Sequence, residues 1–415
     1  MRRPTQVPFP FLPIMLLFQS TPTTKGLSAT VPWITCASSV ELNRAVVQHV
    51  RAGDCVVEFG SQLQDTSKLI VDAVTPAGTA ILLDTQRKIP KKVTSRNENF
   101  RRGTGDVSVK FGAHASFVEL DSFESWRCVA ALEESFKGIS APFDILVCDL
   151  GGMTGNDLTL TTVSFIREFL SRMGTNSPRV VLVKSTALCK LAWRLIHSQR
   201  LFDGSASIYP RKGQSHFRTP GNMRGEPTLI AAVGVEEYRR TIPKAVRRGD
   251  RTLELGCHLG VTTALLHDAS TFEPPPSPPP PSPTSSLPVL RSSGGCVGVD
   301  IGPKIIDRAH ERFPHLNFLV GDAWRTAELQ RVASTTFGRR GEEEASPSSY
   351  DAVYVDVGGL SGSDGVLEAL SLLEALGKAL EPRVIVIKSL CMRRLASSLR
   401  PFSESWIKVH RRERA

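Results

Sequence analysis

Asp356 and Lys388 each stand at the end of a short apolar run, at residues 352–355 and 384–387. Such runs predict buried strands. The carboxyl ends of neighbouring parallel strands meet at one edge of a sheet, so we expect these two side chains to face one cleft. They could form an ion pair. They could instead position and polarise an acceptor hydroxyl, with the ammonium stabilising the developing alkoxide.

A glycine turn precedes this pair along the chain. Residues 252–255 predict a strand, Gly256 to Gly260 a tight turn and residues 261–268 the start of a helix. Glycines let the backbone pass close to a ligand, and Asp300, which ends the next apolar run, could accept hydrogen bonds from a ribose diol. The spacing G-x-x-x-G differs from the dinucleotide fingerprint G-x-G-x-x-G. The stretch predicts a site for a nucleoside-bearing cofactor or, alternatively, a Rossmann-like strand and turn with no ligand.

The chain contains an internal repeat. Five landmarks occur twice in the same order, which indicates two copies of one set of strands and helices. The matching segments are 53–60 with 249–256, 80–84 with 298–300, 117–121 with 318–322, 143–157 with 350–364, and 178–185 with 382–389.

Strands that alternate with helical stretches predict right-handed crossovers and parallel pairing. We therefore expect an α/β protein with two tandem Rossmann-like, doubly wound, mostly parallel sheets. The expected organisation is a leader or disordered tail at 1–40, a first unit at 41–235 and a second unit at 236–415. A proline-rich insertion at 274–288, with nine prolines among fifteen residues, interrupts the second unit. We expect residues 226–235 to close the first sheet.

The turn resembles the first motif of class I S-adenosylmethionine-dependent methyltransferases, because Glu254 stands two positions before Gly256 and Gly260 follows. The resemblance implies S-adenosylmethionine as cofactor, with Asp300 holding the ribose. It also implies that Asp322, with Ala323 beside it, contacts adenine, although Asp322 could equally be a helix N-cap. Cys257 and Ile301, within the turn and after Asp300, complete the candidate cofactor contacts.

The segment around Asp356 and Lys388 is similar to FtsJ-like ribose 2'-O-methyltransferases of RNA, which use a Lys-Asp-Lys-Glu set. Asp356 and Lys388 match the central Asp and the second Lys, and both are the expected catalytic residues. Lys244 is a poor match for the first Lys, and no residue is assigned to the final Glu.

The first copy retains the acidic landmarks and an Asp149–Lys184 pair, but Gln64 replaces the second glycine of its turn. A side chain at this position would crowd a backbone that passes close to a cofactor. We therefore expect the second copy to bind cofactor and the first to be weakened or to act as a scaffold. Two active copies are the alternative.

Charge favours an acidic partner. The chain of 415 residues carries a formal charge of +10, and residues 87–110 contain eight basic and two acidic residues. This segment and residues 393–412 could contact RNA phosphates, or they could be solvated charge runs. No metal site is expected, and no apolar run is long enough to span a membrane.

Residues 1–40 contain no Asp or Glu and carry Arg2, Arg3 and Lys25. Such a leader resembles an organelle transit peptide, which would direct the protein to a plastid or mitochondrion. A disordered tail on a cytoplasmic protein is the alternative. The leading functional hypothesis is an S-adenosylmethionine-dependent methyltransferase with RNA as acceptor. Its alternatives are a methyltransferase acting on a small metabolite or protein, and a non-catalytic scaffold that binds RNA or protein.

Overall fold

The computed structural model gives the fold of most of both repeats. It describes residues 31–60, 65–75, 77–84, 109–110, 115–120, 124–135, 143–149, 159–202, 226–271, 294–337, 350–360, 362 and 365–402. Several predicted features lie outside these ranges: residues 1–30 of the expected leader, Gln64, most of the basic segment 87–110, the proline-rich insertion at 274–288 and residues 403–412 of the second basic segment. Of the helices described, none is both long enough and apolar enough to cross a membrane.

The first sheet has the strand order β14-β1-β7-β6-β2-β3-β5-β4. Every pair is parallel except β4 with β5, which is antiparallel. Its strands are β1 (Trp33–Cys36), β2 (Cys55–Phe59), β3 (Thr79–Asp84), β4 (Val109–Lys110), β5 (Ala115–Glu119), β6 (Ile145–Cys148), β7 (Val180–Lys184) and β14 (Leu399–Pro401).

The second sheet has the strand order β11-β10-β9-β12-β13-β8, with all pairs parallel. Its strands are β8 (Thr228–Ala232), β9 (Arg251–Leu255), β10 (Gly295–Asp300), β11 (Asn317–Val320), β12 (Ala352–Val355) and β13 (Val384–Lys388). The central strands are apolar and buried, as expected of a sheet covered on both faces.

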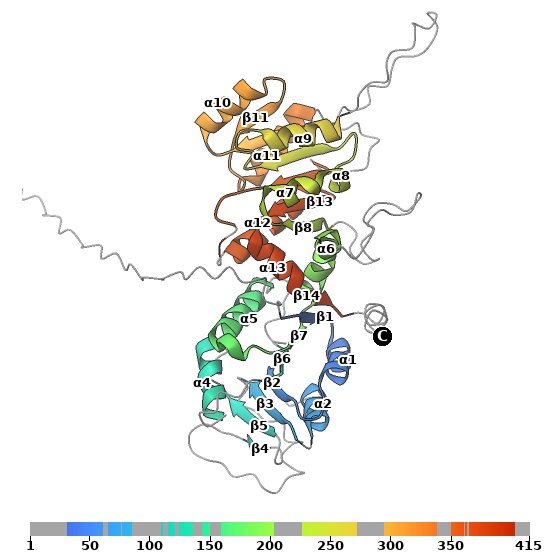
Figure 1. The fold of residues 1–415 in the computed structure, drawn as a ribbon, viewed down its shortest axis with the longest axis vertical. Helices are drawn as coiled ribbons and strands as arrows, with labels where there is room; N and C mark the ends of the chain where they lie inside the picture. The colour runs from blue at the N-terminus through green and yellow to red at the C-terminus, as the bar shows by residue number, and fades with distance from the viewer. Residues whose placement is uncertain are drawn as a thin grey trace, which may run out of the picture. The chain divides into compact units, whose positions relative to one another are not determined.

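Helices connect the parallel strands of both units (Figure 1). In the first unit they are α1 (Ser39–His49), α2 (Asp65–Val74), α4 (Ser125–Ser135), α5 (Thr159–Met173), the 3-10 helix η2 (Gly174–Asn176) and α6 (Thr186–Phe202). In the second they are α7 (Gly234–Arg240), α8 (Ile242–Ala245), α9 (Val261–Ser270), α10 (Pro303–Arg312), α11 (Thr326–Phe337), α12 (Gly365–Leu380) and α13 (Leu390–Ser398).

The two sheets repeat one strand order. The run β1-β7-β6-β2-β3-β5 of the first sheet matches β8-β13-β12-β9-β10-β11 of the second, strand for strand. An equivalent Arg–Asp hydrogen bond also occurs in each unit. Arg179 donates to Asp54 at 2.6 Å in the first, and Arg383 donates to Asp250 at 2.6 Å in the second. The predicted fold class, two tandem Rossmann-like and mostly parallel sheets, is therefore confirmed.

Two short apolar segments lie elsewhere than the sequence predicts. Thr228–Ala232 does not close the first sheet, because β8 pairs with β13 and occupies the position that β1 holds in the first sheet. Trp33–Cys36, at the end of the expected tail at 1–40, is a buried strand paired with β7. Each unit thus begins with a strand before its first helix. The repeat landmarks begin only at the second strand of each unit, so they do not reveal this first one.

The C-terminal strand crosses from the second unit to the first. β14 follows α13 and pairs in parallel with β1, which Figure 1 shows as a red arrow beside a blue one. Phe402, just after β14, donates its backbone N–H to the carbonyl of Thr35 at 2.8 Å. β14 therefore extends the first sheet.

Candidate functional site

The carboxyl edge of the second sheet gathers the predicted chemistry. Because all its strands are parallel, Asp300, Gly256, Asp356 and Lys388 follow or end four strands at the same edge. β10 and β12 lie on either side of β9, so Asp300 and Asp356 are two strand spacings apart, about 10 Å. Asp322 follows β11, one strand beyond Asp300. The edge thus presents three carboxylates and one ammonium in a row.

The turn after β9 needs glycine for packing within the protein. Gly256 has φ +78°, and a Cβ built on it would lie 2.1 Å from the carbonyl oxygen of Asp356. Gly260 has φ +77°, and a Cβ there would lie 2.4 Å from the ring of Phe318. Both positions therefore exclude other residues through conformation and space. Gly256 thus lets the turn lie against the start of the Asp356 loop, and Gly260 lets it lie against Phe318.

Asp300 ties the turn to the loop that follows β10. Its Oδ2 accepts the backbone N–H of His258 at 3.1 Å, and its Oδ1 accepts that of Gly302 at 3.0 Å. His258 has φ +48°, a left-handed conformation that this bond helps to hold. Each carboxylate oxygen can accept two hydrogen bonds, so partly exposed Asp300 can hold both loops and still bind a hydroxyl pair.

Asp322 stabilises a turn. Its Oδ1 accepts the backbone N–H of Trp324 at 3.0 Å, whereas α11 starts only at Thr326. The carboxylate therefore stabilises the turn that precedes α11 and is not the N-cap of this helix. Ala323 is buried in the main apolar core and offers no exposed side chain.

Exposed apolar side chains follow the same strand ends. Ile301, directly after Asp300, is 74% exposed, and Trp324, two residues after Asp322, is 48% exposed. Contiguous exposed apolar surface is typical of interaction sites, and these two side chains follow neighbouring strands of the sheet. Sequence reasoning included Ile301 and missed Trp324, although an indole so close to a predicted adenine contact was a signal for stacking.

Glu254 lies inside the protein. It is 2% exposed and accepts a hydrogen bond from Thr263 Oγ1 of α9 at 2.5 Å. Burial raises its pKa to about 8, and the nearby charge of Asp356 adds to the rise while Arg239 and Lys388 oppose it. Its position fixes α9 against β9, beneath the edge where a ligand would lie.

Asp356 and Lys388 form a direct ion pair. Lys388 Nζ lies 2.5 Å from the Asp356 carboxylate, and the two side chains are 25% and 26% exposed. The backbone N–H of Asp356 donates to Leu255 at 2.8 Å, which fixes the start of the loop. The structure brings together the two predicted catalytic residues and leaves both within reach of a substrate.

Cys257 contributes to packing. Its side chain is buried in a small cluster with Ile306, Ala309 and Phe318, and its backbone N–H donates to Val299 at 3.1 Å. Burial raises the pKa of its thiol, which keeps the sulfur protonated and unreactive. Within the described ranges, no cluster of three or more His, Cys, Asp or Glu side chains is placed to hold a metal ion.

Lys244 lies away from the pair. Its neighbour Ala245 accepts hydrogen bonds from Arg383, the residue immediately before β13 begins. Lys388 ends β13, at the opposite edge of the sheet. Lys244 therefore cannot supply the first lysine of an FtsJ-like set, because the length of the strand separates it from the site.

The first unit has the same kind of ion pair. Lys184 Nζ lies 2.6 Å from the Asp149 carboxylate and 3.3 Å from the hydroxyl of Ser39. Asp84, equivalent to Asp300, is buried, whereas Asp300 is partly exposed. The acid that would meet a ribose is thus accessible only in the second unit.

A scan against protein-family models gave no match, and neither did a search of curated proteins. Among solved structures, the chain is similar to a TehB-like SAM-dependent methyltransferase from Corynebacterium glutamicum, with 20% sequence identity and a TM-score of 0.22. The match covers 36% of this chain and 60% of that one, less than two thirds of its length.

Proposed function

We propose that the second unit binds S-adenosylmethionine and transfers its methyl group to RNA. One observation carries the proposal: a partly exposed carboxylate, Asp300, and an accessible Asp356–Lys388 pair lie about two strand spacings, or roughly 10 Å, apart at one sheet edge. That span suits a ligand whose ribose is at one end and whose reactive methyl is at the other.

The residues fit the cofactor. Asp300 would hold the ribose hydroxyls, and the exposed faces of Ile301 and Trp324 would cover adenine beside Asp322. Gly256 keeps a Cβ atom out of the contact between this bend and the Asp356 loop, and Gly260 keeps one out of the contact between the bend and Phe318. Glu254 and Cys257 support this bend from within, through the bond to Thr263 and the contacts with Phe318.

S-adenosylmethionine supplies a methyl group on a sulfonium, an electrophile that needs only in-line approach of a nucleophilic oxygen. Asp356 would orient the acceptor hydroxyl and receive its proton. The Lys388 ammonium, 2.5 Å from Asp356, would stabilise the negative charge that develops on that oxygen. Positioning supplies most of the rate in such a transfer.

RNA is the acceptor that the charge favours. The formal charge of +10 gives the chain an electrostatic attraction to a polyanion. Arg394 of α13 is an exposed cation in the helix that follows Lys388. Residues 87–110, with their excess of basic side chains, would add phosphate contacts.

Calorimetric titration of the full chain with S-adenosylmethionine tests the cofactor. We expect one molecule per chain, and we expect Asp300→Ala to weaken binding at least about tenfold, because a charge-assisted hydrogen bond contributes roughly 1.5–3 kcal/mol. Asp84→Ala, the equivalent change in the first unit, is the matched control and should leave the affinity unchanged. Absence of binding by the wild type would remove the enzyme hypothesis, and two molecules per chain would make the first unit active as well.

RNA binding is tested separately by filter binding between about 50 mM and about 200 mM salt. Affinity that falls steeply with salt, together with cofactor binding, supports the RNA enzyme. Cofactor binding without RNA affinity would instead indicate a small metabolite or protein acceptor. RNA affinity without cofactor binding would indicate a non-catalytic module.

A further inference from the structure

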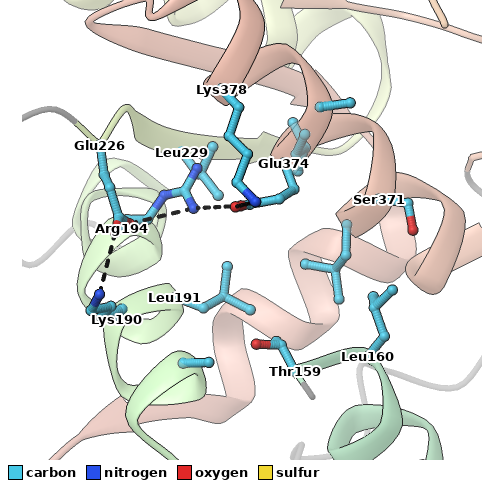
Figure 2. A pocket seen from close by; sticks show the side chains of 14 residues that line it. Thr159, Leu160, Lys190, Leu191, Arg194, Glu226, Leu229, Ser371, Glu374 and Lys378 are labelled. Carbon is cyan, nitrogen blue, oxygen red and sulfur yellow. Dashed lines mark hydrogen bonds and ion pairs between the residues drawn. The ribbon is translucent and has the colours of Figure 1, made fainter. Parts of the chain in front are cut away.

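A cavity of about 540 Å³ is lined mainly by side chains of three helices (Figure 2). Its walls come from α5 and α6 of the first unit and from α12 and the start of β8 in the second. None of its lining residues belongs to the site described above. Its volume falls within the range of small-molecule sites in proteins.

A buried arginine stands in the wall of this cavity. The side chain of Arg194 is 8% exposed, and its Nε donates to the carbonyl of Pro227 at 3.0 Å. Its Nη1 lies 3.3 Å from Glu374 and 3.6 Å from Glu226. Both distances exceed the roughly 2.7–2.9 Å of a tight charge-assisted bond, so the guanidinium is loosely shared between the two carboxylates.

The charges around Arg194 do not cancel. Lys190 pairs with Glu226 at 3.7 Å and Lys378 with Glu374 at 3.3 Å, as the dashed lines of Figure 2 indicate for the Glu226 pair. Three cations therefore meet two carboxylates in the lining. The excess of one positive charge, part of it on a buried side chain, favours a monoanion.

The remaining lining is mostly apolar. Leu160, Leu191 and Leu229 face the cavity from α5, α6 and β8, and Leu370 and Leu373 face it from α12. Leucines that border an open space lose contacts that a ligand would restore. Ser371 and Thr159 supply hydroxyls at the side of Figure 2 opposite the charged cluster.

We propose that this cavity binds a small amphiphilic carboxylate. The carboxylate lies among Lys190, Arg194 and Lys378, and the apolar body covers the leucines of both units. Occupation of the cavity links α6, which begins two residues after Lys184, to α12, which ends four residues before β13.

Calorimetry with decanoate, with decanol as the uncharged analogue and decyltrimethylammonium as the cationic one, tests the site on the full chain. We expect saturable binding of decanoate below about 1 mM and weaker binding of both analogues. The double variant Lys190→Gln, Lys378→Gln should weaken decanoate binding about tenfold and leave decanol unchanged, because it removes two of the three cations, both of them exposed. Lys68→Gln, an exposed lysine of α2, is the matched control and should have no effect.

Ser371→Trp places an indole in the cavity and should abolish decanoate binding, with an unchanged circular dichroism spectrum as evidence of folding. If this variant fails to fold, the decanoate affinity of the Lys190→Gln, Lys378→Gln variant tests the proposal by itself. Three results would overturn the proposal: no saturable binding of decanoate by the wild type, tighter binding of the cationic analogue, or unaltered decanoate affinity in the double variant.

Discussion

At the scale of single residues, substitution of Lys388 tests the proposed chemistry most directly. Its ammonium lies 2.5 Å from Asp356, and the same arrangement occurs at Lys184 and Asp149 in the first unit. Lys184 also contacts the hydroxyl of Ser39. A lysine whose role is to stabilise developing charge should affect turnover more than cofactor affinity.

We expect Lys388→Met to lower methyl transfer to RNA by about a hundredfold or more while the affinity for S-adenosylmethionine stays within about twofold. Methionine keeps the length of the side chain and removes its charge. Transfer of labelled methyl from the cofactor measures the rate, and calorimetry measures the affinity.

Lys184→Met is the matched control and should leave the rate unchanged if the second unit alone is active. Equal turnover in wild type and Lys388→Met would remove Lys388 from the catalytic set. Loss of activity in Lys184→Met, with normal activity in Lys388→Met, would indicate that the reaction takes place in the first unit.

At the scale of elements, the contact between β9 and α9 depends on a buried carboxyl group. Glu254 accepts from Thr263, and Arg239 Nε of α7 bonds the neighbouring Thr262 hydroxyl at 3.0 Å. Burial raises the pKa of Glu254 to about 8 from an ordinary value of 4.5. The folded state therefore holds a proton over a pH range where the unfolded chain has released it.

Stability should respond to pH through this group. Between about pH 4.5 and about pH 8 the folded chain binds more protons at Glu254 than the unfolded chain, so the free energy of unfolding falls as pH rises. We expect Glu254→Gln to lose less stability than the wild type between about pH 5 and about pH 8. Urea denaturation at both pH values measures the difference.

Glu236→Gln, at an exposed position of α7, is the control and should follow the wild-type pH dependence. A pH dependence of Glu254→Gln equal to that of the wild type would show that Glu254 is already ionised in the folded protein.

At the scale of the whole molecule, β14 and Phe402 pack in apolar clusters that include residues of the first unit. Leu399 of β14 is buried in the main apolar cluster, which also contains Leu195 of α6 and Leu373 of α12. Phe402 packs in a second cluster with Ile34 and Leu42 of the first unit. The C-terminal segment should therefore stabilise the N-terminal sheet.

We expect Phe402→Ala to lower the free energy of unfolding by about 3–5 kcal/mol, because it leaves a cavity in the core of the first unit. Hydrogen exchange should accelerate in β1, whose Thr35 carbonyl accepts from the Phe402 amide, before it does in β9 or β12. Denaturant unfolding and exchange mass spectrometry measure the two effects.

Val47→Ala, at an exposed position of α1, should change stability by less than about 0.5 kcal/mol. Exchange in β1 that remains at the wild-type rate in Phe402→Ala would contradict the role given to β14.

The sequence alone determined the repeat, the parallel sheets and the strand ends that carry Asp300, Asp356 and Lys388. It could do so because these depend on local patterns, and because parallel pairing brings all carboxyl ends to one edge. The same rule placed Asp356 and Lys388 at neighbouring strand ends, and the structure shows that they form an ion pair there.

Tertiary structure alone decided where three short apolar strands pair and which way several side chains face. The segments at β1, β8 and β14 are only three to five residues long, so their partners depend on contacts far apart in the chain. Tertiary packing also decided that Glu254 points inward, that Lys244 lies away from the Asp356–Lys388 pair and that a cavity forms around Arg194. Each arises where residues distant in sequence pack together, and a local pattern contains no information about such packing.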